Sequence, residues 1–113
     1  ARSRVLTFAR GLPEAYEDTP WEDDLVVKVN KKIFVFLGSA AGTAISVKLP
    51  ASGDQALGVP GATPTGYGLG RHGWVTVPLA GPDAPPVDVL CDWVEESYRT
   101  VAPKRLVKVL DGA

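Results

Sequence analysis

The chain has 113 residues, of which 45% are hydrophobic and 22% are charged, so its composition is that of one globular domain and not of a disordered or fibrous chain. Its formal net charge of -1 argues against a strongly basic nonspecific nucleic-acid binder, although a local basic patch remains compatible with it. The chain has a single cysteine, Cys91, which excludes an intramolecular disulfide and favours a cytoplasmic location. No apolar run approaches the roughly 20 residues that a membrane-spanning helix needs.

The first quarter of the chain predicts a helix followed by a loop. Ser3 is a candidate N-cap, and Gly11 is a stop signal. Between them, hydrophobic residues recur at the spacing of one helix face, at Val5, Phe8, Ala9 and Leu12. The following segment, 14–24, is acidic and contains Pro20, so we expect a loop there.

Three strands are expected next. The segments 25–29 and 33–37 are rich in β-branched and aromatic residues, and Asn30-Lys31 between them suits a two-residue turn because Asn tolerates a positive φ. This turn would pair Val29 with Lys32 and would point Lys28 toward the face opposite Val27. After a loop of small residues, 43–49 is the third strand.

The second half predicts one more strand and three helices. Ser52 and Gln55 have the spacing of a capping box, which indicates a short helix to about residue 57. Glycine-rich loop covers 59–73, with a candidate edge strand at 67–69, and 74–79 is a strand. Pro86 opens a long helix and Pro103 ends it and starts another. The apolar faces of these two helices are Val87, Leu90, Cys91, Val94, Tyr98 and Val101, then Leu106, Val107 and Leu110.

These elements predict a single α+β domain over residues 1–113. Hairpin-type connections make the sheet antiparallel, with about four to five strands, and the N-terminal and C-terminal helices pack on it.

Two sequence features have the form of catalytic motifs but lack the context. Residues 68–75 read G-x-G-x-x-G-x-V, as in kinase and dinucleotide-binding loops, yet a glycine-rich loop precedes them and a strand follows. His72 and Cys91 have no ligand-type neighbours in sequence, and Cys91 lies on the apolar face of its helix. We therefore expect a non-enzymatic protein with no catalytic residues, no cofactor and no obligate small-molecule ligand.

An acidic run lies in the segment 14–24. Its six carboxylates could attract a hard cation or a protein partner, but their spacing fits no defined calcium loop. A solvated polar loop is the ordinary interpretation, and no metal ligand is assigned. The carboxylates are Glu14, Glu17, Asp18, Glu22, Asp23 and Asp24.

Five cations are the candidate nucleic-acid-binding residues: Lys28, Lys31, Lys32, Lys48 and Arg71. They flank the predicted hairpin and the third and fourth strands, so a converging arrangement would form a basic patch that contacts a phosphate backbone. Solvated strand ends, with lysines protecting a sheet edge, explain the same residues equally well.

Five segments, in order, resemble the recurring segments of the MmcQ/YjbR family: GLPEAYEDTPW, KVNKKIFVFL, ISVKL, RHGWVTV and WVEESYRTV. The matched positions are Leu12-Pro13, Pro20-Trp21, Lys28-Val29, Lys32-Ile33-Phe34, Ile45-Ser46, Lys48, Arg71, His72, Trp74-Val75 and Ser97-Tyr98. The chain departs from the family at the tight turn, where Asn30-Lys31 stands in place of the usual glycine.

The resemblance implies a small bacterial cytosolic domain with a frataxin-type (CyaY-like) α+β fold. Members of the family are described as predicted DNA-binding proteins with a double wing, a description that rests on structural analogy. We therefore expect a DNA-binding domain that contacts phosphates through the lysine-bearing hairpin. The alternative is a frataxin-like metal-binding or protein-partner adaptor that uses the acidic segment 14–24, and an enzyme with an unrecognised site ranks last.

Overall fold

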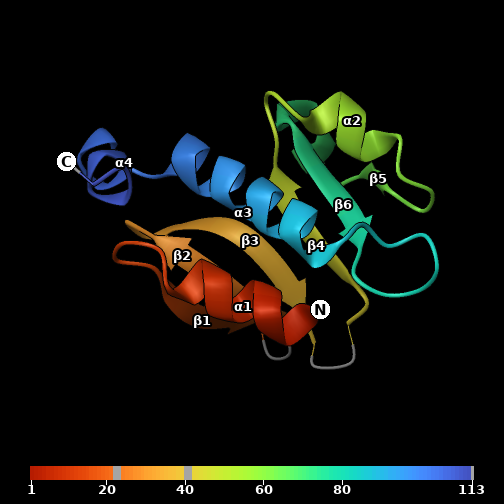
Figure 1. Cartoon of the computed structure of the whole chain (residues 1–113), viewed down its shortest axis with the longest axis horizontal. Helices are drawn as coiled ribbons and strands as arrows, with labels where there is room; N and C mark the ends of the chain where they lie inside the picture. The colour runs from red at the N-terminus through yellow and green to blue at the C-terminus, as the bar shows by residue number, and fades with distance from the viewer. Residues whose placement is uncertain (22–23, 40–41, 113) are drawn as a thin grey trace.

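The structure is a computed structural model that describes residues 1–21, 24–39 and 42–112. Along the chain, the elements are α1 (Arg2–Arg10), β1 (Tyr16–Trp21), β2 (Asp24–Val29), β3 (Lys32–Gly38), β4 (Ala44–Lys48), α2 (Gly53–Leu57), β5 (Thr63–Pro64), the 3-10 helix η1 (Leu69–His72), β6 (Trp74–Pro78), α3 (Val87–Val101) and α4 (Lys104–Leu110) (Figure 1). The predicted α+β class is confirmed. None of the described helices is both long enough and apolar enough to cross a membrane.

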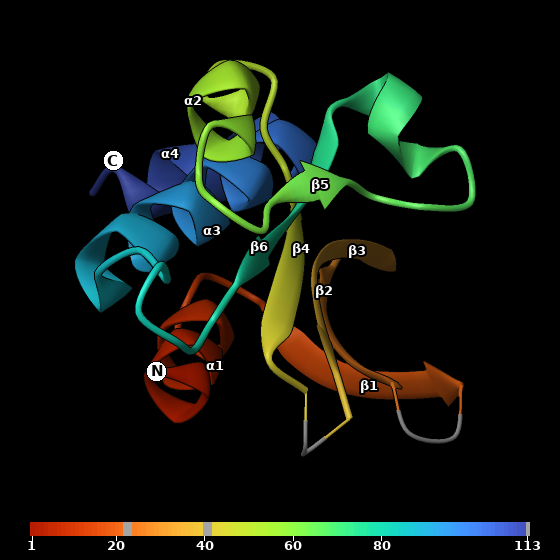
Figure 2. The same ribbon diagram turned by 90° about the vertical axis from the view of Figure 1, so that its right-hand side faces the viewer.

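The strands form one antiparallel sheet in the order β1-β2-β3-β4-β6-β5. The six strands of this sheet are slightly more than the four to five expected from the sequence. The helices α1 and α3 pack on one face of the sheet, against β2, β3 and β4. Figure 2 shows these helices on one side, while the segment that carries β5 and η1 extends toward the other. We call this second side the open face.

The β2–β3 hairpin has the predicted two-residue turn. Asn30 and Lys31 have φ values of 51° and 67°, as a type I′ turn requires, and Val29 pairs with Lys32. An irregularity between Val27 and Lys28 then shifts the register by one residue on β3.

This shift explains how two consecutive residues of β3, Phe34 and Val35, both reach the hydrophobic core. Val27 pairs with Val35, whereas Lys28 pairs with Ile33. Since Val27 and Val29 are buried on the helix side, the alternation of the strand places Lys28 on the open face, as predicted.

The loop predicted for 14–24 and the edge strand predicted for 67–69 are both wrong. The segment 14–24 contains an edge strand, because Tyr16, Glu17 and Asp18 pair with β2 while their polar side chains stay accessible. Pro20 near its end is compatible with an edge position. The second edge strand is Thr63–Pro64 and not 67–69, where the chain instead enters η1.

Neither serine proposed as a helix cap makes a side-chain capping hydrogen bond, although Ser52 does stand at the N-cap position of α2. The first helix begins at Arg2, so Ser3 lies inside it. The short helix after Ser52 is confirmed, but the Ser52 hydroxyl donates to Glu96 Oε1 at 2.6 Å. The other oxygen of Glu96 accepts from the backbone N–H groups of Ala51 and Ser52, each at 3.0 Å. Glu96 therefore holds the start of α2 against α3.

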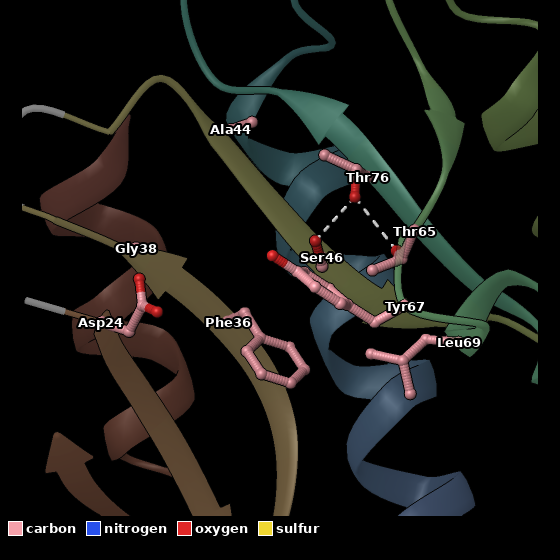
Figure 3. A pocket seen from close by; sticks show the side chains of 9 residues that line it. All are labelled: Asp24, Phe36, Gly38, Ala44, Ser46, Thr65, Tyr67, Leu69 and Thr76. Carbon is pink, nitrogen blue, oxygen red and sulfur yellow. Dashed lines mark hydrogen bonds between the residues drawn. The ribbon is translucent and has the colours of Figure 1, made fainter. Parts of the chain in front are cut away.

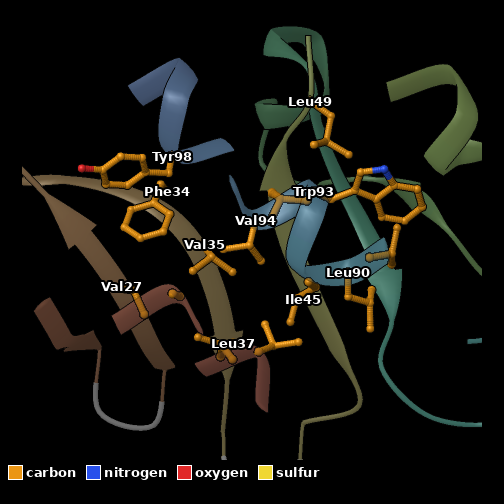
Figure 4. Packing of buried hydrophobic residues seen from close by; sticks show 14 of the residues in the cluster. Val27, Phe34, Val35, Leu37, Ile45, Leu49, Leu90, Trp93, Val94 and Tyr98 are labelled. Carbon is orange, nitrogen blue, oxygen red and sulfur yellow. The ribbon is translucent and has the colours of Figure 1, made fainter. Parts of the chain in front are cut away.

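The core lies between the sheet and α3 (Figure 4). Leu90, Val94 and Tyr98 are fully buried on the predicted face of α3, and burial of each such side chain contributes roughly 1.5–3 kcal/mol. The Tyr98 ring meets Phe34 edge to face, with ring centroids 5.3 Å apart, and its hydroxyl donates to the Pro13 carbonyl at 2.8 Å. Tyr98 thus connects α3, β3 and the segment after α1.

Candidate functional site

The five candidate cations lie at one end of the sheet, which we call the hairpin end. It comprises the end of β2, the start of β3, the end of β4 and the start of β6. The antiparallel register brings these termini together, because Lys48 pairs with Trp74 and Lys28 pairs with Ile33. Arg71 lies in η1, three residues before Trp74. Residues distant in the chain are therefore brought to the same end of one sheet.

The cations do not all face the same way. Lys28 and Lys48 lie on the open face, where Lys28 pairs with Ile33 of β3 and Lys48 pairs with Trp74 of β6. Lys31 is at the tip of the hairpin, and Lys32 pairs with Val29, whose side chain faces the helices. The cations at the hairpin end therefore form a rim, which runs from Lys48 on the open face, past Lys31 at the tip, to Lys32 on the helix side.

Lys28 contributes less charge to this rim than the sequence suggests. Its Nζ lies 2.7 Å from a carboxylate oxygen of Asp18 in β1. The hydrogen bond between them raises the pKa of Lys28 and lowers the pKa of Asp18, which also accepts from the Thr19 N–H. Within the described residues, Lys31, Lys32, Lys48 and Arg71 make no ion pair.

A groove of about 770 Å³ lies on the open face (Figure 3). Its lining residues come from four strands and from the loop that precedes β6: Asp24, Phe36, Gly38, Ala44, Ser46, Thr65, Tyr67, Leu69 and Thr76. Phe36 packs edge to face against Trp74, with ring centroids 5.2 Å apart. Among the described residues, the groove therefore has an aromatic and aliphatic wall and one carboxylate, that of Asp24.

Three hydroxyl groups form a ladder along the floor of this groove. Ser46 and Thr76 lie opposite each other in the sheet, with their hydroxyl oxygens 2.7 Å apart, and Thr65 Oγ1 is 3.0 Å from Thr76 Oγ1. Two hydrogen bonds use only two of the three O–H hydrogens. At least one hydroxyl hydrogen, and several lone pairs, therefore stay available to a molecule in the groove.

The glycine pattern of residues 68–75 is explained by the turn that it forms. Gly68 and Gly73 flank η1 with φ values of 79° and 88°, which favour glycine. A Cβ at Gly70 would lie 2.7 Å from the Cβ of Pro64. The predicted loop leading into a strand is confirmed, and the glycines serve the close approach of this loop to β5.

The acidic segment is largely paired with cations. Glu14 binds Arg105 at 3.0 Å and Glu17 binds Arg10 at 2.7 Å, in addition to the Asp18–Lys28 pair. The Arg105 hydrogen bond lowers the pKa of Glu14. Glu22 and Asp23 lie outside the described residues. Within the part of the chain that the structure describes, no three histidine, cysteine or carboxylate side chains are grouped to hold a metal ion.

His72 lies in η1, whereas Cys91 and Ser97 lie in α3. His72 is exposed on η1, whereas Ser97 is fully buried, with its hydroxyl bonded to the Phe34 carbonyl and the Lys48 N–H. Cys91 is half-buried, and burial raises the pKa of its thiol. A protonated thiol at neutral pH is a poor nucleophile.

The groove is not predictable from the local sequence pattern. The alternation of Phe36, Ser46 and Thr76 onto the open face depends on the register of three strands, which was uncertain from the sequence. One local signal was present: Tyr67 stands between Gly66 and Gly68 in a long loop, an unusual position for a large aromatic side chain.

Comparison with known proteins shows the family through a family model and the fold through a solved structure. A model of the YjbR family matches residues 10–100. The crystal structure of Deinococcus radiodurans protein DR2400, described with the family domain DUF419, has a similar fold, with a TM-score of 0.74. It is 23% identical in sequence, and the match covers 88% of this chain and 76% of that chain. No curated protein matches this chain. Because the family model spans most of the chain, this protein belongs to the YjbR family.

Proposed function

We propose that this protein is a non-enzymatic DNA-binding domain that contacts the phosphate backbone through the hairpin end of its sheet. The observation that supports this function is the grouping of four cations, from three different parts of the chain, that make no ion pair within the described residues. These are Lys31 at the hairpin tip, Lys32 at the start of β3, Lys48 at the end of β4 and Arg71 in η1.

Their accessibility supports the same function. Lys31, Lys32 and Arg71 are exposed and Lys48 is half-buried, so all four can reach a ligand without rearrangement of the core. Each cation that contacts a phosphate releases about one counterion, so four contacts give a logarithmic salt dependence with a slope of roughly -3 to -4 on duplex DNA.

The acidic adaptor has less support. Three of its carboxylates are held in ion pairs with Arg105, Arg10 and Lys28, and such carboxylates offer less charge to a metal ion or a basic partner. No observation on the described residues favours this alternative over the DNA-binding function.

Fluorescence anisotropy with a short labelled duplex at low and at physiological salt tests the proposal. We expect binding at low salt that weakens steeply as salt rises, and a clear loss of affinity in Lys32→Ala and in Lys48→Ala. Arg4→Ala is the control, since it removes one exposed cation from α1, on the helix side of the sheet. Absence of binding at low salt, or equal losses in all three variants, would contradict the proposal.

A further inference from the structure

We infer that the groove on the open face receives bases of a single-stranded nucleic acid whose phosphates lie on Lys48 and Arg71. This inference rests on the proposed function, since it uses two of the same cations, and it specifies the form of nucleic acid that the domain prefers.

Tyr67 is the first reason. Its side chain is fully exposed, so no contact within the chain holds it, yet it lines the groove and reaches over it toward the Ser46 side (Figure 3). Its φ of 59° is a conformation that costs a residue with a Cβ roughly 1 kcal/mol. Folding gains nothing from an aromatic ring at this position, whereas a ring beside an open groove is a stacking surface for a base.

The positions of the cations are the second reason. A Cβ on Gly68 would lie 3.2 Å from Nη2 of Arg71, so the guanidinium lies against the backbone between Tyr67 and Leu69, two residues that line the groove. Lys48 follows Ser46 by two residues on the open face and pairs with Trp74. Positive charge therefore borders the aromatic wall directly.

The opposite end of the groove has the opposite charge. Asp24 starts β2, which runs toward the hairpin end, so its carboxylate lies at the end of the groove away from Lys48. A phosphate is attracted to one end and repelled from the other. The occupant that fits this arrangement has an anionic group on one side of a flat, hydrogen-bonding body, as a nucleotide has.

The floor and size of the groove fit such a body. The hydroxyl ladder of Ser46, Thr65 and Thr76 offers both donors and acceptors to a base edge, and Phe36 and Leu69 supply apolar contact. A volume of about 770 Å³ lies in the range of pockets that bind organic ligands. In a duplex the faces of the bases are already stacked on one another, so only an unpaired base can place its face against Tyr67.

Anisotropy measurements on one labelled single strand, its duplex and a free mononucleotide test this inference. We expect the single strand to bind more tightly than the duplex of the same length. Tyr67→Ala should weaken single-strand binding roughly ten-fold or more, while Tyr67→Phe keeps most of the affinity because its ring still stacks. Leu57→Ala, which removes an exposed apolar side chain from α2, is the control and should change nothing.

The outcomes separate this inference from the proposed function. Duplex binding that equals single-strand binding and ignores Tyr67→Ala would overturn the base-binding groove while leaving the phosphate-binding function intact. A mononucleotide that binds as tightly as the strand would also overturn it, since the groove would then be a small-molecule site. Failure of all nucleic acids to bind at low salt would overturn both.

Discussion

The Ser97 hydroxyl accepts a hydrogen bond from the backbone N–H of Lys48, at 2.9 Å, and donates one to the carbonyl of Phe34. Direct pairing of β3 with β4 covers Val35 with Val47 and Phe36 with Ser46. The hydroxyl therefore bridges the two strands just beyond their paired residues, at the point where β4 delivers Lys48 to the hairpin end. The neighbouring Tyr98 fixes the same helix to Phe34 and Pro13. The Ser-Tyr pair of α3 therefore attaches this helix to β3, to β4 and to the segment after α1.

Substitution of Ser97 by alanine should destabilise the protein. The buried Phe34 carbonyl and Lys48 N–H would each lose a partner, and an unsatisfied buried group costs about 1–3 kcal/mol. Urea denaturation measures the change in the free energy of unfolding. Ser3→Ala, at an exposed position of α1, is the control and should change it by less than about 0.5 kcal/mol. Equal stabilities of the two variants would show that the bridge is dispensable.

Tyr98→Phe should change both stability and its pH dependence. Loss of the hydrogen bond to Pro13 lowers the free energy of unfolding by about 0.5–1.5 kcal/mol near neutral pH. Burial raises the pKa of Tyr98 above its ordinary value near 10, so the folded state holds this proton more tightly than the unfolded state. The stability from this group is therefore complete below about pH 10 and is lost as the pH rises through the folded pKa.

Urea denaturation of wild type and Tyr98→Phe between neutral pH and alkaline pH measures this effect. The wild type should lose stability more steeply than the variant as the pH passes 10. Tyr67→Phe changes an exposed tyrosine and should follow the wild type. Parallel curves for wild type and Tyr98→Phe would contradict the assignment.

Asp18→Asn should strengthen nucleic-acid binding. The substitution removes the carboxylate that holds the Lys28 ammonium at 2.7 Å, so Lys28 becomes available to a phosphate. We expect a several-fold gain in affinity at low salt and a logarithmic salt slope steeper by about one. Glu17→Gln removes the same charge from the neighbouring residue, whose partner is Arg10, and is the matched control. Equal gains in both variants would indicate a general charge effect and not the release of Lys28.

Lys31→Gly should weaken nucleic-acid binding without lowering the stability of the fold. Lys31 has a φ of 67°, a conformation that costs an ordinary residue roughly 1 kcal/mol and costs glycine little. The variant should therefore be as stable as the wild type or more stable by up to about 1 kcal/mol, yet bind nucleic acid more weakly. Lys31→Ala loses the same charge without the conformational relief. Unchanged affinity in both variants would remove Lys31 from the interface.

The local pattern of the sequence predicted most elements of the fold. The β-branched and aromatic residues of 25–29 and 33–37, with the left-handed tolerance of Asn30, predict the hairpin, its turn and the face of Lys28. The segment 14–24 has the composition of a loop, and its strand exists only through pairing with β2, so the local sequence does not predict it. An edge strand with one solvated side has little hydrophobic periodicity to detect.

The candidate site was predictable only in part. The positions of the five cations beside the predicted strands follow from the sequence, but the ion pair of Lys28 depends on β1, a strand that the sequence does not predict. The groove depends on three strand registers and on the path of a glycine-rich loop, which no local pattern encodes. Side chains such as Tyr67 that line a site without being buried give no hydrophobic signal of their own.

The central claim is that the cations at the hairpin end, and not positive charge in general, bind a polyanion. Two triple variants of equal charge test it: Lys32→Ala, Lys48→Ala and Arg71→Ala together, against Arg4→Ala, Lys104→Ala and Lys108→Ala together. The measurement is the slope of the logarithm of the nucleic-acid affinity against the logarithm of salt concentration. We expect the first triple variant to lose affinity and to reduce the slope by about three, while the second stays near the wild type. Identical slopes and affinities for the two triple variants would contradict the claim.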